Sequence, residues 1–136
     1  MVSISLQIWH PKINKGEIIK CINLEPSRCF SIGEQKMTPR GTKLLGVWET
    51  TYVSYSLVSE EDIDIDAGIE KAIALLKNSI NDSSIFQQFS STGGKCSFYI
   101  SLYEKTHIAF EISSSLIERM RELNIDLGFE FFLDWE

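Results

Sequence analysis

A short segment near the start of this chain recurs, at a constant offset and without a gap, near its end. Residues 14–17 align with residues 115–118, and in both copies a basic residue, an apolar residue, an Asn and an apolar-acidic pair follow in the same order. Each copy begins with a helix N-cap signal and ends in an alternating strand. The repeat predicts two strand–helix–strand units with right-handed crossovers, by duplication or by convergence of capping and alternation patterns.

Hydrophobic periodicity places the other elements. Strands are expected at residues 3–8, 28–32, 44–58, 95–103, 108–112 and 127–133, and helices at 14–23, 66–80 and 115–123. Residues 33–42 read as a polar loop, and 82–94 as one or two helical turns. The order βαββαββαβ predicts a single α+β domain over residues 1–136. Its expected form is one twisted, mainly antiparallel sheet of about six strands with helices on one face, and with ferredoxin-like elements.

The helix ends are predicted from capping residues. Asn14, Asp66 and Ser115 are expected to be the three N-caps, with Glu17 and Glu118 completing capping boxes. The last helix is expected to turn four apolar residues inward: Leu116, Ile117, Met120 and Leu123.

Charge and cysteine content narrow the class of protein. Nineteen acidic against thirteen basic residues give a net charge of −6, which disfavours nucleic acid and suits a basic protein partner. No apolar run is long enough to span a bilayer, so no membrane association is expected. The three cysteines lack Cys-x-x-Cys spacing, which favours a reducing, cytoplasmic setting over a disulfide framework. The first residues alternate like a strand and not like a signal peptide.

Catalytic and metal-binding residues are not predicted. Cys29 or Cys96 could pair with His10 or His107 as nucleophile and base, but no third residue is suggested that would orient the base. Cys96 also lies on the apolar side of its strand, where cysteine usually acts as a small hydrophobic residue. Residues 60–70 lack the spacing of a calcium-binding loop. The sequence therefore predicts a protein that is not an enzyme and needs no cofactor or metal.

Two groups of residues are candidates for partner binding. Glu60, Glu61, Asp62 and Asp64 form an acidic segment before the middle helix, suited to a basic partner. A solvated turn is the alternative, because the positive helix N-terminus accounts for Asp64 and Asp66 but not for the carboxylates further upstream.

Tyr99 and Tyr103 are the other candidates. They are expected on the open face of the sheet, where they would contact a partner or a second copy in a homodimer, or simply pack. Base stacking on such aromatics is disfavoured by the negative charge.

Four basic residues flank the polar loop: Arg28, Lys36, Arg40 and Lys43. No glycine-rich phosphate cradle accompanies them, so they are expected to be solvated or paired with Glu34.

Several short motifs resemble the domain of unknown function 4279 family. They are Leu24-Glu25-Pro26-Ser27-Arg28, Ile32-Gly33-Glu34, Pro39-Arg40-Gly41 and Gly46-Val47-Trp48, together with the helix and strand over residues 116–127. The chain departs from the family in having no histidine in its middle helix. The resemblance implies a small bacterial protein without established catalytic residues. Some relatives look like immunity proteins, which would make the partner a cognate toxin domain whose active site is occluded. The alternative is a regulatory module that binds a small molecule between sheet and loop.

Overall fold

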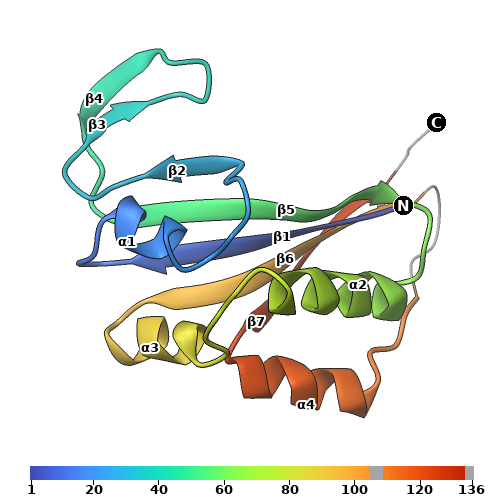
Figure 1. Ribbon diagram of the computed structural model, residues 1–136. Coiled ribbons are helices and arrows are strands. Elements are labelled where there is room, and N and C mark those ends of the chain that lie inside the picture. Colours follow the sequence, from blue (N-terminus) through green and yellow to red (C-terminus); the bar gives the residue numbers. More distant parts are fainter. Residues whose placement is uncertain (105–108, 134–136) are drawn as a thin grey trace.

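The computed structural model describes residues 1–104 and 109–133, which form an α+β structure (Figure 1). The helices are α1 (Lys15–Ile19), α2 (Ile65–Lys77), α3 (Ile85–Ser91) and α4 (Ser114–Leu123). The strands are β1 (Val2–His10), β2 (Arg28–Phe30), β3 (Gln35–Met37), β4 (Lys43–Val47), β5 (Thr51–Glu61), β6 (Lys95–Glu104) and β7 (Asp126–Leu133).

Five of these strands form the main sheet, in the order β2-β5-β1-β6-β7. Its pairs are antiparallel except for β6 and β7, which run parallel. The other two strands, β3 and β4, pair only with each other. The prediction of a mainly antiparallel α+β fold is therefore confirmed, whereas the single sheet of about six strands and the order βαββαββαβ are wrong in detail.

The repeated segments build the two edges of the main sheet. β1 and β2 run parallel because each pairs antiparallel with β5, which lies between them. β6 and β7 run parallel as direct neighbours. Each matched segment therefore supplies a helix, α1 or α4, and then an edge strand parallel to the strand before that helix. The two units predicted from the repeat are present, one of them split by an inserted strand.

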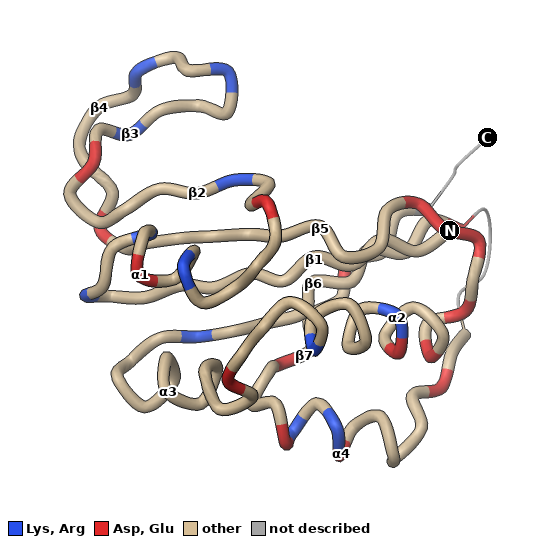
Figure 2. The backbone as a smooth tube through the Cα atoms, viewed as in Figure 1, with Lys and Arg blue, Asp and Glu red and all other residues tan. Residues whose placement is uncertain are grey.

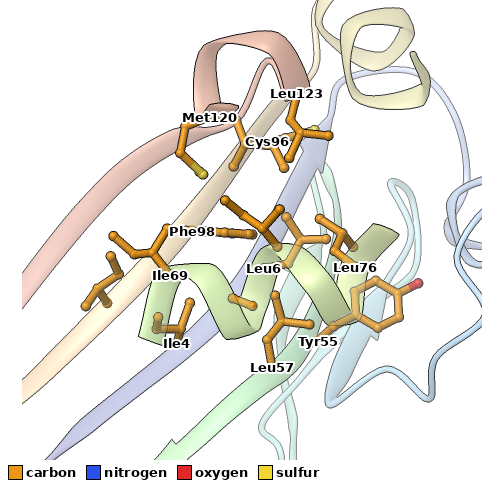
Figure 3. Packing of buried hydrophobic residues seen from close by; sticks show 14 of the residues in the cluster. Ile4, Leu6, Tyr55, Leu57, Ile69, Leu76, Cys96, Phe98, Met120 and Leu123 are labelled. Carbon is orange, nitrogen blue, oxygen red and sulfur yellow. The ribbon is translucent and has the colours of Figure 1, made fainter. Parts of the chain in front are cut away.

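The helices cover one face of the main sheet, and the alternation of β1 shows which face that is (Figure 1). Its even-numbered residues are buried and its odd-numbered ones are only partly covered. Leu6 and Phe98 from the sheet meet Ile69 and Leu76 of α2 in the core (Figure 3). Each such fully buried side chain contributes roughly 1.5–3 kcal/mol before entropy is counted. The odd-numbered face is left open to solvent or to a partner.

The helix caps correct two predictions. Asn14 caps α1 as expected, with its Oδ1 accepting from the Glu17 N–H at 3.0 Å. The middle helix is capped by Asp64 and not by Asp66, because burial of Ile65 starts the helix earlier. The last helix is capped by Ser113 and not by Ser115, so Glu118 stands too far along the helix to complete a capping box.

The segment from 33 to 58 differs most from its prediction. The expected polar loop contains β3, which forms a hairpin with β4, and the expected long strand is divided into β4 and β5. Gly33 and Trp48 close the hairpin base, since the Gly33 N–H donates to the Trp48 carbonyl at 2.8 Å. The hairpin is mostly exposed, so it has no alternating apolar pattern from which strands could be recognised.

Two predictions near the end of the chain are also wrong. Residues 109–112 form no strand, and Ile108 lies outside the described residues. Ile117 is 52% exposed, so it does not face inward with Leu116, Met120 and Leu123. The helical turns predicted within 82–94 are confirmed as α3.

Candidate functional site

One end of the main sheet gathers the acidic residues that the sequence singles out (Figure 2). Val2 at the start of β1 is opposite Glu61 of β5 on one side and Leu102 of β6 on the other. The end of β5 and the last residues of β6 and β7 therefore lie at the same end of the sheet, with the start of β1 between β5 and β6. We call this region the acidic end and define it by Glu60, Glu61, Asp62, Asp64 and Glu104.

The carboxylates of the acidic end are not equally free. Glu61 pairs with Lys71 of α2, and Asp64 accepts a hydrogen bond from the Ala67 N–H at 2.8 Å as the cap of that helix. Glu60 and Asp62 are exposed and take no part in the ion pairs formed among the described residues. Two of the four predicted acidic residues thus support the fold, and the other two are exposed carboxylates without an ion pair among the described residues.

Glu60 marks a sharp change in chain direction. Its φ is +46°, in the left-handed region that residues other than glycine seldom adopt. The Glu60 N–H donates to Ser3 Oγ at 2.9 Å, and the pairing of β1 with β5 is irregular next to Ser3. The strand end is therefore fastened to β1 by its backbone, which leaves the Glu60 carboxylate exposed.

The two predicted tyrosines have different surroundings. Tyr103 stacks on Phe132 with ring centroids 4.9 Å apart, and both side chains are exposed at the acidic end, by 36% and 41%. Tyr99 lies four residues further back, opposite Ser5, and its hydroxyl donates to the Glu130 carboxylate. The structure therefore places Tyr103 at the same end of the sheet as the acidic residues but leaves Tyr99 half-buried in the middle of the sheet.

A hollow of about 230 Å³ lies at the acidic end, between the start of α2 and the last residues of β6. Asp64 and Glu104 contribute carboxylates to its lining, and Ile63, Leu102 and Phe110 are among its apolar residues. Glu104 is also 3.9 Å from the Met1 amino group, an exposed contact of small energy. A cleft lined by both apolar residues and carboxylates suits the alkyl stem and charged head of Lys or Arg.

The opposite end of the sheet carries an aromatic cluster that the sequence analysis missed. Trp9 lies 5.3 Å from Tyr52, Tyr52 lies 5.4 Å from Phe30, and Phe30 stacks on Trp48 at 3.7 Å. These rings lie on the open face, beside the β3–β4 hairpin. We call this region the hairpin end and define it by these four aromatic residues and three cations over their rings: Arg28, Lys36 and Lys95. Matching the polar-side positions of β1, β2 and β5 would have revealed it.

The prediction for the four basic residues near the hairpin holds in part, because Arg40 and Lys43 are exposed to solvent. Glu34 pairs with Lys15 at 3.1 Å, whereas Arg28 and Lys36 lie over the ring of Trp48. A groove of about 410 Å³ runs between β2 and the hairpin, with Arg28, Phe30 and Trp48 along its wall. Such a groove offers planar apolar surface beside positive charge.

The described cysteines and His10 do not form a catalytic pair. Cys96 is buried, which raises the pKa of its thiol to about 12, with Asp126 adding to the shift. His10 is also buried, with Nε2 2.8 Å from Thr92 Oγ1 and Nδ1 accepting from the backbone N–H groups of Lys12 and Ile13. Burial, helped by Lys12, lowers the pKa of His10. His107 lies outside the described residues.

Across 1–104 and 109–133 no three His, Cys, Asp or Glu side chains are placed to hold a metal ion together. None of the helices in this part of the chain combines the length and hydrophobicity needed to cross a bilayer.

Comparison of the chain with protein-family models, with curated proteins and with solved structures gave no match. The resemblance to the domain of unknown function 4279 family therefore stays a prediction, and the functional argument rests on the geometry of the two ends.

Proposed function

We propose that this protein binds another protein without catalysing a reaction, through its acidic end. The proposal rests on one observation: the exposed carboxylates of Glu60 and Asp62 lie at the same end of the main sheet as the stacked and exposed pair Tyr103 and Phe132. Aromatic anchors with charges at their rim are the usual composition of a protein interface, and carboxylates select a basic partner. The hollow beside Asp64 and Glu104 would accept a Lys or Arg side chain of that partner.

Within this class, the function that fits best is that of a bacterial immunity protein. A cytoplasmic immunity protein would bind the basic domain of one cognate toxin and occlude its active site. Support comes from the exposed acidic end and from the family resemblance of the sequence. An immunity function of this kind would require no cofactor or metal, since recognition would depend on shape and charge.

The test uses a toxin domain encoded beside the gene of this protein. Co-expression should rescue cells from that toxin, and the purified pair should bind with an affinity that falls as salt rises. The double variant Glu60→Lys/Asp62→Lys should bind on the order of 10-fold more weakly, mostly through slower association.

A matched control separates docking from net charge. The variant Glu118→Lys/Glu122→Lys makes the same change in charge on exposed positions of α4 and should bind like the unaltered protein. Equal affinities for both double variants would exclude the acidic end as the docking surface. Failure of the protein to rescue cells from the neighbouring toxin would exclude the immunity function.

A second candidate function is favoured by the groove at the hairpin end. Its Arg28, Phe30 and Trp48 could hold a planar anionic metabolite between the sheet and the hairpin, as expected of a small regulatory module. A panel of such compounds should then raise the melting temperature of the purified protein by mass action, and Trp48→Ala should abolish the shift. A panel without effect would argue against this alternative.

A further inference from the structure

The two edges of the main sheet are protected to very different degrees. β2 is three residues long, follows Pro26 and leads directly into the hairpin. β7 is eight residues long, contains neither proline nor lysine, and pairs with β6 in an unbroken register. In the described part of the chain no strand lies beyond it. Sheet proteins usually shorten, bend or charge their edges, because an unprotected edge pairs with another strand.

Apolar side chains also accumulate along the β7 edge. On the helix-covered face, Phe131 is 48% exposed and contacts Phe110 and Phe129. A groove of about 310 Å³ continues this apolar surface between β7 and α4, and Ile117 and Leu127 are among the residues that line it. The exposed position of Ile117, unexplained within one copy of the chain, belongs to this groove.

We propose that β7 pairs antiparallel with β7 of a second copy, on a two-fold axis at Phe129. In this register Phe129 meets its own counterpart and Leu127 meets Phe131, so every pair on the helix-covered face is apolar. On the open face, Asp126 meets Phe132 and Gly128 meets Glu130. The two five-stranded sheets become one continuous sheet, in which each β7 has a neighbour on both sides.

Charge selects this register over its neighbours. In a symmetric antiparallel pair, two residues that face each other lie on the same face of the sheet. The two-fold axis must therefore pass through a residue position, and each alternative register places it at a neighbouring residue. With the axis at Glu130, that carboxylate would face its own copy. With the axis at Gly128, Asp126 would face Glu130. The Phe129 axis is the one among these three that places no like charges opposite each other, and the edge is self-complementary there.

The dimer leaves the exposed carboxylates of the acidic end uncovered, although it places Phe132 opposite Asp126 of the second copy. Glu60 and Asp62 follow from β5, which is separated from β7 by β1 and β6. A dimer through β7 therefore leaves one acidic end free on each copy. It also differs from the dimer through the open sheet face that the sequence suggested.

The first test is the oligomeric state of the full chain. Sedimentation velocity from about 1 to about 500 µM, a range that spans micromolar affinity, should show a monomer that converts to a dimer as concentration rises. A monomer throughout this range would overturn the proposal.

The second test uses Gly128, which faces Glu130 of the second copy in the proposed register. A Cβ at Gly128 meets only ordinary contacts, the nearest at 3.7 Å from Ser97 Oγ, so a side chain can start at this position without a clash of its Cβ. Gly128→Glu places like charges opposite each other on both sides of the axis, and Gly128→Lys places opposite charges there. The dimer dissociation constant of Gly128→Glu should exceed that of Gly128→Lys by about tenfold.

Ser56→Glu and Ser56→Lys are the matched controls. They make the same changes of net charge at an exposed position of β5, near the other edge of the sheet. Their dissociation constants should differ much less than those of the Gly128 pair. A dimer that responds equally to both pairs of variants would place the interface elsewhere and overturn the β7 pairing. Melting temperatures of the four variants identify any that fails to fold, and the wild-type measurement stands without them.

Discussion

The acidic end and the hairpin end contain similar side chains in opposite situations. At the hairpin end four aromatic rings contact one another in sequence, and cations lie over them, so each ring is held by several neighbours. At the acidic end Tyr103 and Phe132 contact each other and keep a third or more of their surface exposed. The hairpin end is thus consolidated by packing, whereas the aromatic pair at the acidic end keeps much of its surface exposed.

Truncation of Trp48 should have the largest effect, because its ring joins the hairpin to the sheet through Phe30. Trp48→Ala should lower the free energy of unfolding by about 2–4 kcal/mol, less than for a fully buried aromatic residue, since Trp48 is only half-buried. Urea unfolding measures the loss, and hydrogen exchange of the β3 and β4 amides should accelerate.

Leu45→Ala is the control for the hairpin itself. Leu45 lies on β4 with 97% of its surface exposed, so its truncation should leave stability within about 0.5 kcal/mol of the unaltered protein. Equal losses for the two variants would show that the aromatic stack does not hold the hairpin.

Replacement of His10 should have the next largest effect. His10→Ala leaves the backbone N–H groups of Lys12 and Ile13 without their acceptor, which should cost about 1–3 kcal/mol at pH 7.5. Burial lowers the pKa of His10, so the unfolded chain binds its proton more readily than the folded one. Stability from this group is therefore complete above about pH 6.5 and falls as the pH drops toward the folded pKa.

The pH dependence separates the role of the imidazole from a loss of packing. Chemical unfolding of the unaltered protein between about pH 7.5 and pH 5 should show a decline that is weaker in His10→Ala. Parallel curves for the two proteins would mean that the pKa of His10 is the same in the folded and the unfolded chain.

The sequence predicted the sheet far better than the two ends. Strict alternation fixed β1 and β6, because one face of each strand is covered by helices and the pattern reports burial directly. The hairpin has no covered face, so β3 and β4 read as loop and as part of a longer strand. The aromatic cluster was missed for a related reason: Trp9, Phe30 and Tyr52 stand at polar-side positions of three strands whose register only the fold supplies.

The acidic segment was located correctly, but its residues could not be divided between folding and binding. Whether a carboxylate caps a helix depends on where that helix begins, and the start of α2 follows from the burial of Ile65. Pairing of Glu61 with Lys71 likewise depends on the angle between β5 and α2. Local sequence carries neither piece of information.

Asp64 and Asp62 allow that division to be tested. Asp64→Ala removes the cap of α2 and should cost about 1 kcal/mol, as is typical of an N-cap. Asp62→Ala removes an exposed carboxylate two residues earlier and should change stability by less than about 0.5 kcal/mol. Thermal unfolding of the two variants side by side measures the contrast, and the reverse order would contradict the assignment of the cap.

Truncation of Tyr103 should have the smallest effect on stability. It therefore contrasts most strongly with truncation of Trp48. The Tyr103 side chain stacks on Phe132 and keeps 36% of its surface exposed, so Tyr103→Ala should change the free energy of unfolding by about 0.5–1 kcal/mol, the energy of one stacked pair. Urea unfolding beside Trp48→Ala gives the comparison. If the protein binds through its acidic end, Tyr103→Ala should lose far more in partner affinity than in stability, because an aromatic anchor acts mainly in the complex. A loss of stability as large as that of Trp48→Ala would mean that both ends are consolidated alike, and the distinction between a folding end and a binding end would fail.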